Sequence, residues 1–177
     1  MIEDLRSTKF VFTSFCLTCA SFQANGIVKG KWRSSIVPVV QMLMKHDVNI
    51  IQLPCPEASF GGYMQGLARK PQGLKGYSTL EYQSHCETIS DDVIQKAVGI
   101  IERGFRIAAF IGIENSPSCA VSHIYTNRGM LKRRGIFFEI LHKRLLENNI
   151  NVPFVGINRR SIDKATDRLT AIFDSWE

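Results

Sequence analysis

Short apolar runs alternate with longer amphipathic stretches along this chain, and this alternation restricts its fold more than any other feature. Four runs rich in β-branched and aromatic residues cover positions 9–15, 49–53, 106–113 and 152–157. Near-continuous apolar runs of this length are typical of strands that are covered on both faces, as in a parallel sheet. Because helical patterns separate the runs, we predict an α/β protein with a mostly parallel sheet and right-handed crossovers.

The spacing of apolar residues predicts four helices. The first begins at Ser34 or Ser35, the second at Ser90, the third near Phe137 and the last at Ser161. Ser90 is a candidate N-cap because a hydroxyl followed by two aspartates suits the positive N-terminal end of a helix.

Residues 56–78 break the alternation, since seven glycines and prolines lie close together there. A long glycine-rich segment next to the end of a strand is typical of a lid or a mobile excursion. No other stretch resembles a linker, so we expect one domain over residues 1–177.

The composition argues against a membrane span and a secretory signal, and it permits a protein that binds an anionic partner. No run reaches the roughly 18 apolar residues that a membrane span needs, and residues 1–6 are too polar and acidic for a secretory signal. Twenty-two Lys and Arg against sixteen Asp and Glu give a net charge of +6, which permits an anionic or nucleic-acid partner. Basic stretches at 132–134 and 159–160 are usually solvated surface; the functional interpretation is attraction for a nucleotide or for RNA.

The five cysteines carry the strongest indication of chemistry. Their odd number and the absence of an export signal favour reduced thiols in a cytoplasmic protein. Cys16, Cys55 and Cys119 each follow a predicted strand, and the carboxyl ends of parallel strands meet at one edge of a sheet, where ligands bind. A single cysteine is commonly a small buried hydrophobe. Three convergent thiolates suit zinc or an iron–sulfur cluster, and the spacing alone does not choose between them.

Several segments of the chain resemble the thiouracil desulfidase family and its related desulfidases, from about residue 10 to residue 158. The segments are Phe-Cys-Leu at 15–17, Leu-Pro-Cys-Pro-Glu at 53–57 with Gly-Gly at 61–62, Ser-Pro-Ser-Cys-Ala-Val at 116–121, Gly-Ile-Phe at 135–137 and Asn-Val-Pro-Phe-Val-Gly-Ile at 151–157. The Cys-Pro-Glu and Ser-Pro-Ser-Cys elements are specific when they occur together in this order.

This resemblance implies a three-layer, Rossmann-like domain with helices on both faces of the sheet. It also implies a 4Fe–4S cluster held by Cys16, Cys55 and Cys119. The family's catalytic carboxylate matches Glu57 and its catalytic serine matches Ser116, while Ser118 is the second serine candidate, assigned to substrate binding. The implied activity is hydrolytic removal of sulfur from a small thiolated substrate such as a thiouracil-like base or nucleoside, with a nucleotide or RNA as a further partner and no membrane.

The sequence also departs from the family pattern and leaves alternatives open. Family members often continue after the first cysteine with Arg-Tyr-Asp-Gly, and here only Gly26 matches; Ala120 stands where glycine is common. These changes bear on the substrate more than on the cluster. Two other interpretations stay open: a non-catalytic carrier of hydrosulfide or of a metal cluster, and a zinc or thiol redox protein that uses the Cys-x-x-Cys pair of Cys16 and Cys19.

Overall fold

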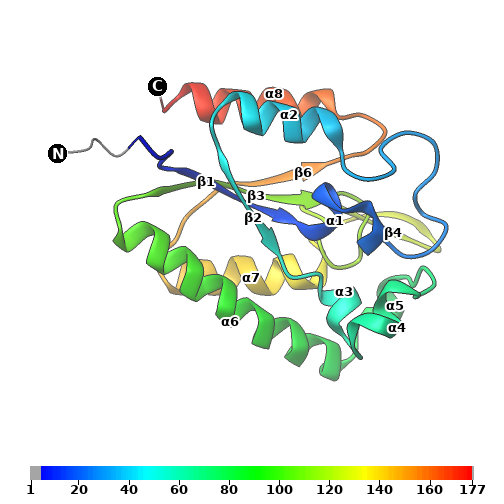
Figure 1. The fold of residues 1–177 in the computed structure, drawn as a ribbon. Coiled ribbons are helices and arrows are strands. Elements are labelled where there is room, and N and C mark those ends of the chain that lie inside the picture. The colour runs from blue at the N-terminus through cyan, green and yellow to red at the C-terminus, as the bar shows by residue number, and fades with distance from the viewer. Residues whose placement is uncertain (1–4, 177) are drawn as a thin grey trace.

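The structure, a computed structural model that describes residues 5–176, places a four-stranded sheet between two layers of helices (Figure 1). All neighbouring strands pair in parallel, in the order β2-β1-β3-β6. This arrangement confirms the predicted α/β class and the three-layer, Rossmann-like architecture. The strands are β1 (Lys9–Ser14), β2 (Asn49–Leu53), β3 (Arg106–Ile113) and β6 (Phe154–Ile157).

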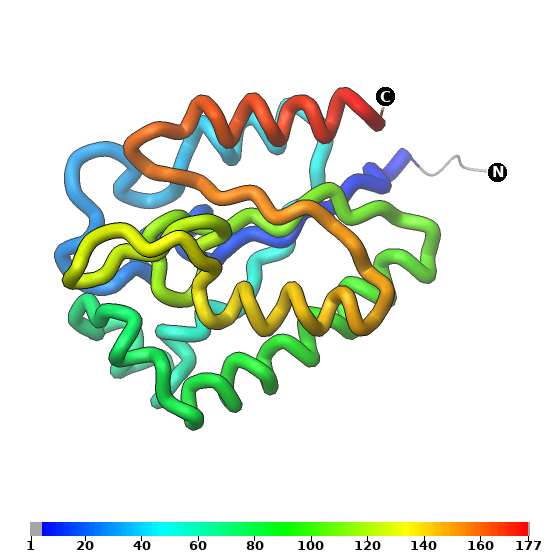
Figure 2. The backbone as a smooth tube through the Cα atoms, turned by 180° about the vertical axis from the view of Figure 1, so that it is seen from behind, coloured from blue at the N-terminus to red at the C-terminus, as the bar shows by residue number. Residues whose placement is uncertain are grey.

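Each face of the sheet is buried by two helices (Figure 2). Side chains of α2 (Val37–Lys45) and α8 (Asp163–Asp174) form one core with alternate residues of the strands, such as Val11. Side chains of α6 (Leu80–Glu102) and α7 (Ile136–Glu147) form the other core, which Phe12 enters from the opposite face of the same strand. The strands therefore read as apolar on both faces because both faces are covered.

Three phenylalanines lie side by side across the sheet on the face under α6 and α7. Phe12 is the register partner of Phe110, and Phe110 is the register partner of Phe154. The rings stack with centroids 4.8 Å and 5.2 Å apart. Stacked aromatic pairs of this kind on neighbouring strands help fix the register of a sheet.

Helix α6 begins ten residues earlier than predicted. The side chain of Thr79 accepts a hydrogen bond from the backbone N–H of Tyr82 and caps the helix. Ser90 is not a cap: it is buried in the middle of the helix and donates to the carbonyl of Cys86 over 2.7 Å. No helix among residues 5–176 has the length and apolarity that crossing a membrane requires.

The segment predicted as a glycine-rich loop contains three short helices, α3 (Pro56–Ser59), α4 (Tyr63–Leu67) and α5 (Leu74–Tyr77). Proline suits the first turn of a helix because its φ is already helical, and Pro56 takes that position. The sequence analysis also missed an antiparallel hairpin, β4 (His123–Thr126) with β5 (Gly129–Lys132). Two shorter elements, α1 (Phe15–Thr18) and η1 (Ala20–Phe22), follow β1 directly.

Two glycines provide a test of how tightly the sheet is packed. A Cβ at Gly112 in β3 would overlap the carbonyl oxygen of Cys119 and lie 2.6 Å from the ring of Phe138, whereas a Cβ at Gly99 in α6 would meet nothing within 4 Å. We expect Gly112→Ala to lower the free energy of unfolding by about 1–3 kcal/mol through overpacking. Gly99→Ala, the matched control, should raise it by up to about 1 kcal/mol. Urea denaturation measures both, and equal shifts would contradict the packing described for β3.

Candidate functional site

The three cysteines predicted to converge all lie at the carboxyl edge of the sheet. Ser14 and Leu53 are register partners at the ends of β1 and β2, and Cys16 and Cys55 each follow two residues later. After β3 the chain turns back, so that the carbonyl of Cys119 accepts a hydrogen bond from the N–H of Ile113 over 3.1 Å. Parallel strand ends and this return bring the three cysteines to the same edge.

The three thiols at this edge influence one another electrostatically and are influenced by one carboxylate. Burial raises the pKa of Cys16 to about 12, with further contributions from Cys55 and Glu57. Burial likewise raises the pKa of Cys119, and Cys16, Cys55 and Glu57 add to that shift. Charged thiolates are therefore costly here unless a positively charged partner such as a metal centre compensates them.

The other two cysteines differ from these three. Cys86 is fully buried in α6 and contributes to the core under the sheet. Cys19 is half-buried just after α1, and its backbone N–H donates to the carbonyl of Phe15. All five thiols are free.

The described residues do not bring three Cys, His, Asp or Glu side chains close enough together to hold a single metal ion. A mononuclear zinc centre needs such a set around one point. In an iron–sulfur cluster the thiolates bind different iron atoms, so the ligands are spread apart. The cluster that the resemblance implies stays a prediction.

Glu57 lies at the centre of a hydrogen-bonded network that spans two loops. Its Oε2 accepts from Nη2 of Arg69 over 3.1 Å and from Nε over 3.3 Å, and its Oε1 accepts from the hydroxyl of Ser116 over 3.4 Å. The Ser116 oxygen itself accepts from the backbone N–H groups of Ser118 and Cys119. The two accepted bonds hold the hydroxyl in place, and its proton is directed at the carboxylate.

Arg69 is the residue of this site that the sequence did not reveal. Its guanidinium also donates to the carbonyls of Gly66 and Phe22, and the side chains of the ion pair are only 10% and 12% exposed. The carboxylate of Glu57 raises the pKa of Arg69, although burial alone would lower it. The sequence gives no sign of which of the neighbouring cations, Arg69 or Lys70, is buried. In the fold, the position of α4 buries Arg69 and leaves Lys70 exposed.

Ser118, the second serine candidate, is fully buried. Its hydroxyl lies 2.7 Å from that of Tyr82 on α6, in the wall between the sheet edge and the helix. This contact gives Ser118 a packing role, and its assignment to substrate binding stays a prediction.

The carboxyl edge also collects buried polar atoms that lack a hydrogen-bond partner. In the described part of the chain these atoms belong to residues that end or follow strands or lie in the loops beside them: Thr13, Ser14, Gln23, Tyr77, Asn115 and Arg159. Gln23 and Arg159 both lower the pKa of Cys16, and Ser14 lowers that of Cys119, which places these groups beside the thiols.

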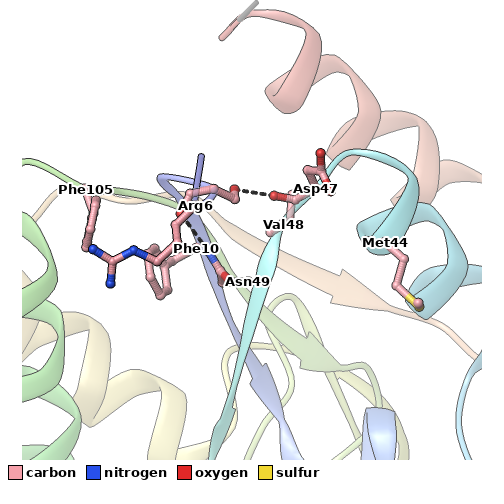
Figure 3. A pocket seen from close by; sticks show the side chains of 8 residues that line it. Arg6, Phe10, Met44, Asp47, Val48, Asn49 and Phe105 are labelled. Atoms are coloured by element: carbon pink, nitrogen blue, oxygen red, sulfur yellow. Dashed lines mark hydrogen bonds between the residues drawn. The ribbon is translucent and has the colours of Figure 1, made fainter. Parts of the chain in front are cut away.

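Of two cavities, one lies next to the network of Glu57 and Arg69 and the other lies at the far edge of the sheet. The larger, of about 530 Å³, lies at the opposite, amino edge of the sheet, beside the register partners Phe10 and Asn49 (Figure 3). The smaller, of about 200 Å³, adjoins the network described above, because Glu57 and Arg69 form part of its wall. We place the functional site at the smaller cavity, because Glu57 and Arg69 of the network line it. Its other lining residues are Phe60, Gln65, Gly66, Gln72, Gly76 and Tyr77.

A relative of known sequence establishes the family of this chain. The uncharacterized protein MJ0003 of Methanocaldococcus jannaschii is 32% identical over 121 residues, which cover 67% of this chain and 71% of that protein. The chain therefore belongs to the MJ0003 family. No family model matches it.

Among solved structures, the chain is similar to the [4Fe–4S]-dependent thiouracil desulfidase TudS. The two align with a TM-score of 0.50 and 17% identity, over 92% of this chain and 99% of TudS. At this level of identity, the likeness shows that the two proteins share a fold.

The buried ion pair predicts a large effect of one substitution on stability. Arg69→Met leaves the Glu57 carboxylate buried without its cation and should lower the free energy of unfolding by about 3 kcal/mol. The matched control is Lys96→Met, which removes an exposed ion pair with Asp92 and should cost less than about 1 kcal/mol. Urea denaturation of both variants measures the difference. Similar losses would show that the Arg69–Glu57 pair is not buried in solution.

Proposed function

We propose that the protein is a desulfidase that replaces the sulfur of a thiolated heterocycle, such as a thiouracil-like base or nucleoside, with oxygen. The observation that carries this proposal is the position of the three thiols beside the Ser116–Glu57–Arg69 network, in a chain with the fold of TudS. Water adds its oxygen to the ring carbon, and the sulfur leaves as hydrosulfide. The reaction is a hydrolysis and needs no oxidant or reductant.

Cys16, Cys55 and Cys119 would hold a 4Fe–4S cluster. Cys16 and Cys119 are each coupled electrostatically to Cys55, and thiolates that disfavour one another would be stabilised by binding cationic iron. When it is held by three cysteines, such a cluster supplies an iron with an open position, a soft Lewis acid for a thiocarbonyl sulfur. All five thiols are free, as expected of a protein in a reducing cytoplasm.

Glu57 and Ser116 would move the protons. Arg69 neutralises one oxygen of the carboxylate and leaves the other facing the Ser116 hydroxyl. The carboxylate is thus held in place, where it would accept a proton from the attacking water, and Ser116 would pass that proton toward a ring nitrogen of the substrate. The adjoining cavity of about 200 Å³ has room for only a small ring.

Single cysteine substitutions test the cluster. After anaerobic purification, the unaltered protein should contain iron and sulfide and absorb visible light through thiolate-to-iron bands. Cys16→Ser, Cys55→Ser and Cys119→Ser should each lose most of the iron. Cys86→Ser and Cys19→Ser are the controls and should keep it. A colourless protein with stoichiometric zinc would contradict the cluster and favour the zinc or thiol redox interpretation.

Variants of the network test the catalytic step separately from the cluster. Glu57→Gln should keep the iron but lower the rate of sulfide release from thiouracil by at least about 100-fold, because it removes the proton acceptor. Ser116→Ala should also keep the iron and slow the release. The control is Glu81→Gln, at the exposed start of α6. Iron-loaded protein that binds hydrosulfide but releases none from thiouracil would favour a carrier over an enzyme.

A further inference from the structure

The charges of this protein are divided between the carboxyl edge of the sheet and the rest of the molecule. The segments that follow the four strands at that edge are residues 15–36, 54–79, 114–135 and 158–162. They contain twelve Lys and Arg against two Glu, a net charge of +10, whereas the remaining residues contain ten Lys and Arg against fourteen Asp and Glu, a net charge of −4. The modest overall charge of +6 conceals this division.

The two acidic residues of this edge do not offset the positive charge at the surface. Glu57 is paired with buried Arg69. Glu114 turns inward, where its carboxylate accepts the backbone N–H groups of Ser122 and His123. Neither carboxylate is available to an exposed lysine or arginine.

Eight exposed cations at this edge make no ion pair with any residue between 5 and 176. We call them the basic rim: Lys29, Lys31, Arg33, Lys70, Lys75, Arg128, Lys132 and Arg160. On the helices under the sheet the pattern differs, because Lys96, Lys143 and Arg144 each pair with a neighbouring carboxylate. Like charges that have no ion-pair partners repel one another. The rim therefore lowers the free energy of unfolding unless an anion binds there.

Exposed aromatic side chains lie among these cations. Tyr125 on the β4–β5 hairpin is 62% exposed, Tyr63 on α4 is 49% exposed, and Phe60, in the wall of the small cavity, is 37% exposed. The hairpin and α4 project at the same end of the molecule as the strand ends (Figure 1). Cations that contact a phosphate backbone, together with aromatic rings on which bases stack, are the two features of surfaces that bind single-stranded nucleic acids.

We propose that the basic rim binds the backbone of a single-stranded nucleic acid, with bases stacking on Tyr125 and Tyr63. The cations come from four separate loops around the site and not from one face of one helix, as in proteins that lie on an anionic membrane. The small cavity has space for one base and no room for a duplex. This binding depends on surface charge and needs neither the cluster nor catalysis.

Two charge-reversed variants of the full-length protein test the rim on different loops. One is Lys31→Glu/Arg33→Glu, and the other is Arg128→Glu/Lys132→Glu. Binding to fluorescent oligouridine and oligothymidine of equal length is measured by anisotropy over a series of salt concentrations. Each variant should bind at least about tenfold more weakly, and its logarithmic salt slope should be shallower by about 1.4, since each phosphate contact on a single strand contributes about 0.7.

The matched control reverses two exposed cations at the opposite edge of the sheet, Lys45→Glu/Arg103→Glu. Lys45 ends α2 before β2, and Arg103 follows α6 before β3, so both lie far from the strand ends. The change in net charge is identical, and the affinity should stay within about threefold of the unaltered protein, since long-range effects are screened by salt. Cys119→Ser should also bind normally, which separates this inference from the proposed function.

Each result has a defined meaning. Weakened binding in both rim variants with normal binding in the control supports the proposal, and a preference for one of the two oligomers identifies RNA or DNA as the source. The proposal is overturned if neither oligomer binds at about 50 mM salt, where phosphate contacts are strong, or if the control loses as much affinity as the rim variants. It is also overturned if a duplex binds more tightly, or if phosphatidylserine vesicles bind and oligomers do not compete.

Discussion

The parallel pairing of β1 with both β2 and β3 is the constraint on which the site depends. Parallel pairing directs the ends of three strands that are distant in sequence to the same edge, and the register makes Ser14 and Leu53 level. Cys16 and Cys55 each follow these strand ends by two residues. A shift of one residue would turn every side chain of β1 to the other face, exchanging Val11 and Phe12 between the two cores. The packing that fixes the register therefore also fixes the thiols.

Much of this arrangement could be predicted from the sequence, for identifiable reasons. The bounds of β2 and β3 were predicted correctly because continuous apolar runs end abruptly where a buried strand ends. The start of α6 was wrong because Asp91 and Asp92 resemble the first turn of a helix, whereas in the fold Asp92 pairs with Lys96 and Asp91 with Arg144 of the neighbouring α7. The hairpin was missed because only Ile124 of its strand residues is buried, so no apolar periodicity marks it.

In the candidate site too, some residues could be recognised from the sequence and others only from the folded structure. Glu57 and Ser116 were predicted from the resemblance of their Cys-Pro-Glu and Ser-Pro-Ser-Cys segments to the desulfidase family. Arg69 was not, since its role comes from α4 carrying it back over α3, and Gly66 makes that return possible: a Cβ there would overlap the backbone of Ala58. A tertiary contact of this kind leaves no periodic signal. The basic rim is also invisible locally, because its eight cations are scattered over four segments that only the parallel sheet brings together.

The electrostatics of the edge make sense only when its buried and exposed parts are considered together. Inside, three thiols are desolvated and lie near Glu57, which raises their pKa values and disfavours the thiolate form. Outside, unpaired cations surround them and repel one another. Neither the desolvated thiols nor the mutually repelling cations of the rim stabilise the fold. A partner of opposite charge would offset each cost: a metal cluster for the thiols and an anionic chain for the rim. The fold itself is held by two apolar cores and the phenylalanine stack, which lie behind the strand ends. The stable part of the molecule thus supports the edge at which we propose that both ligands bind.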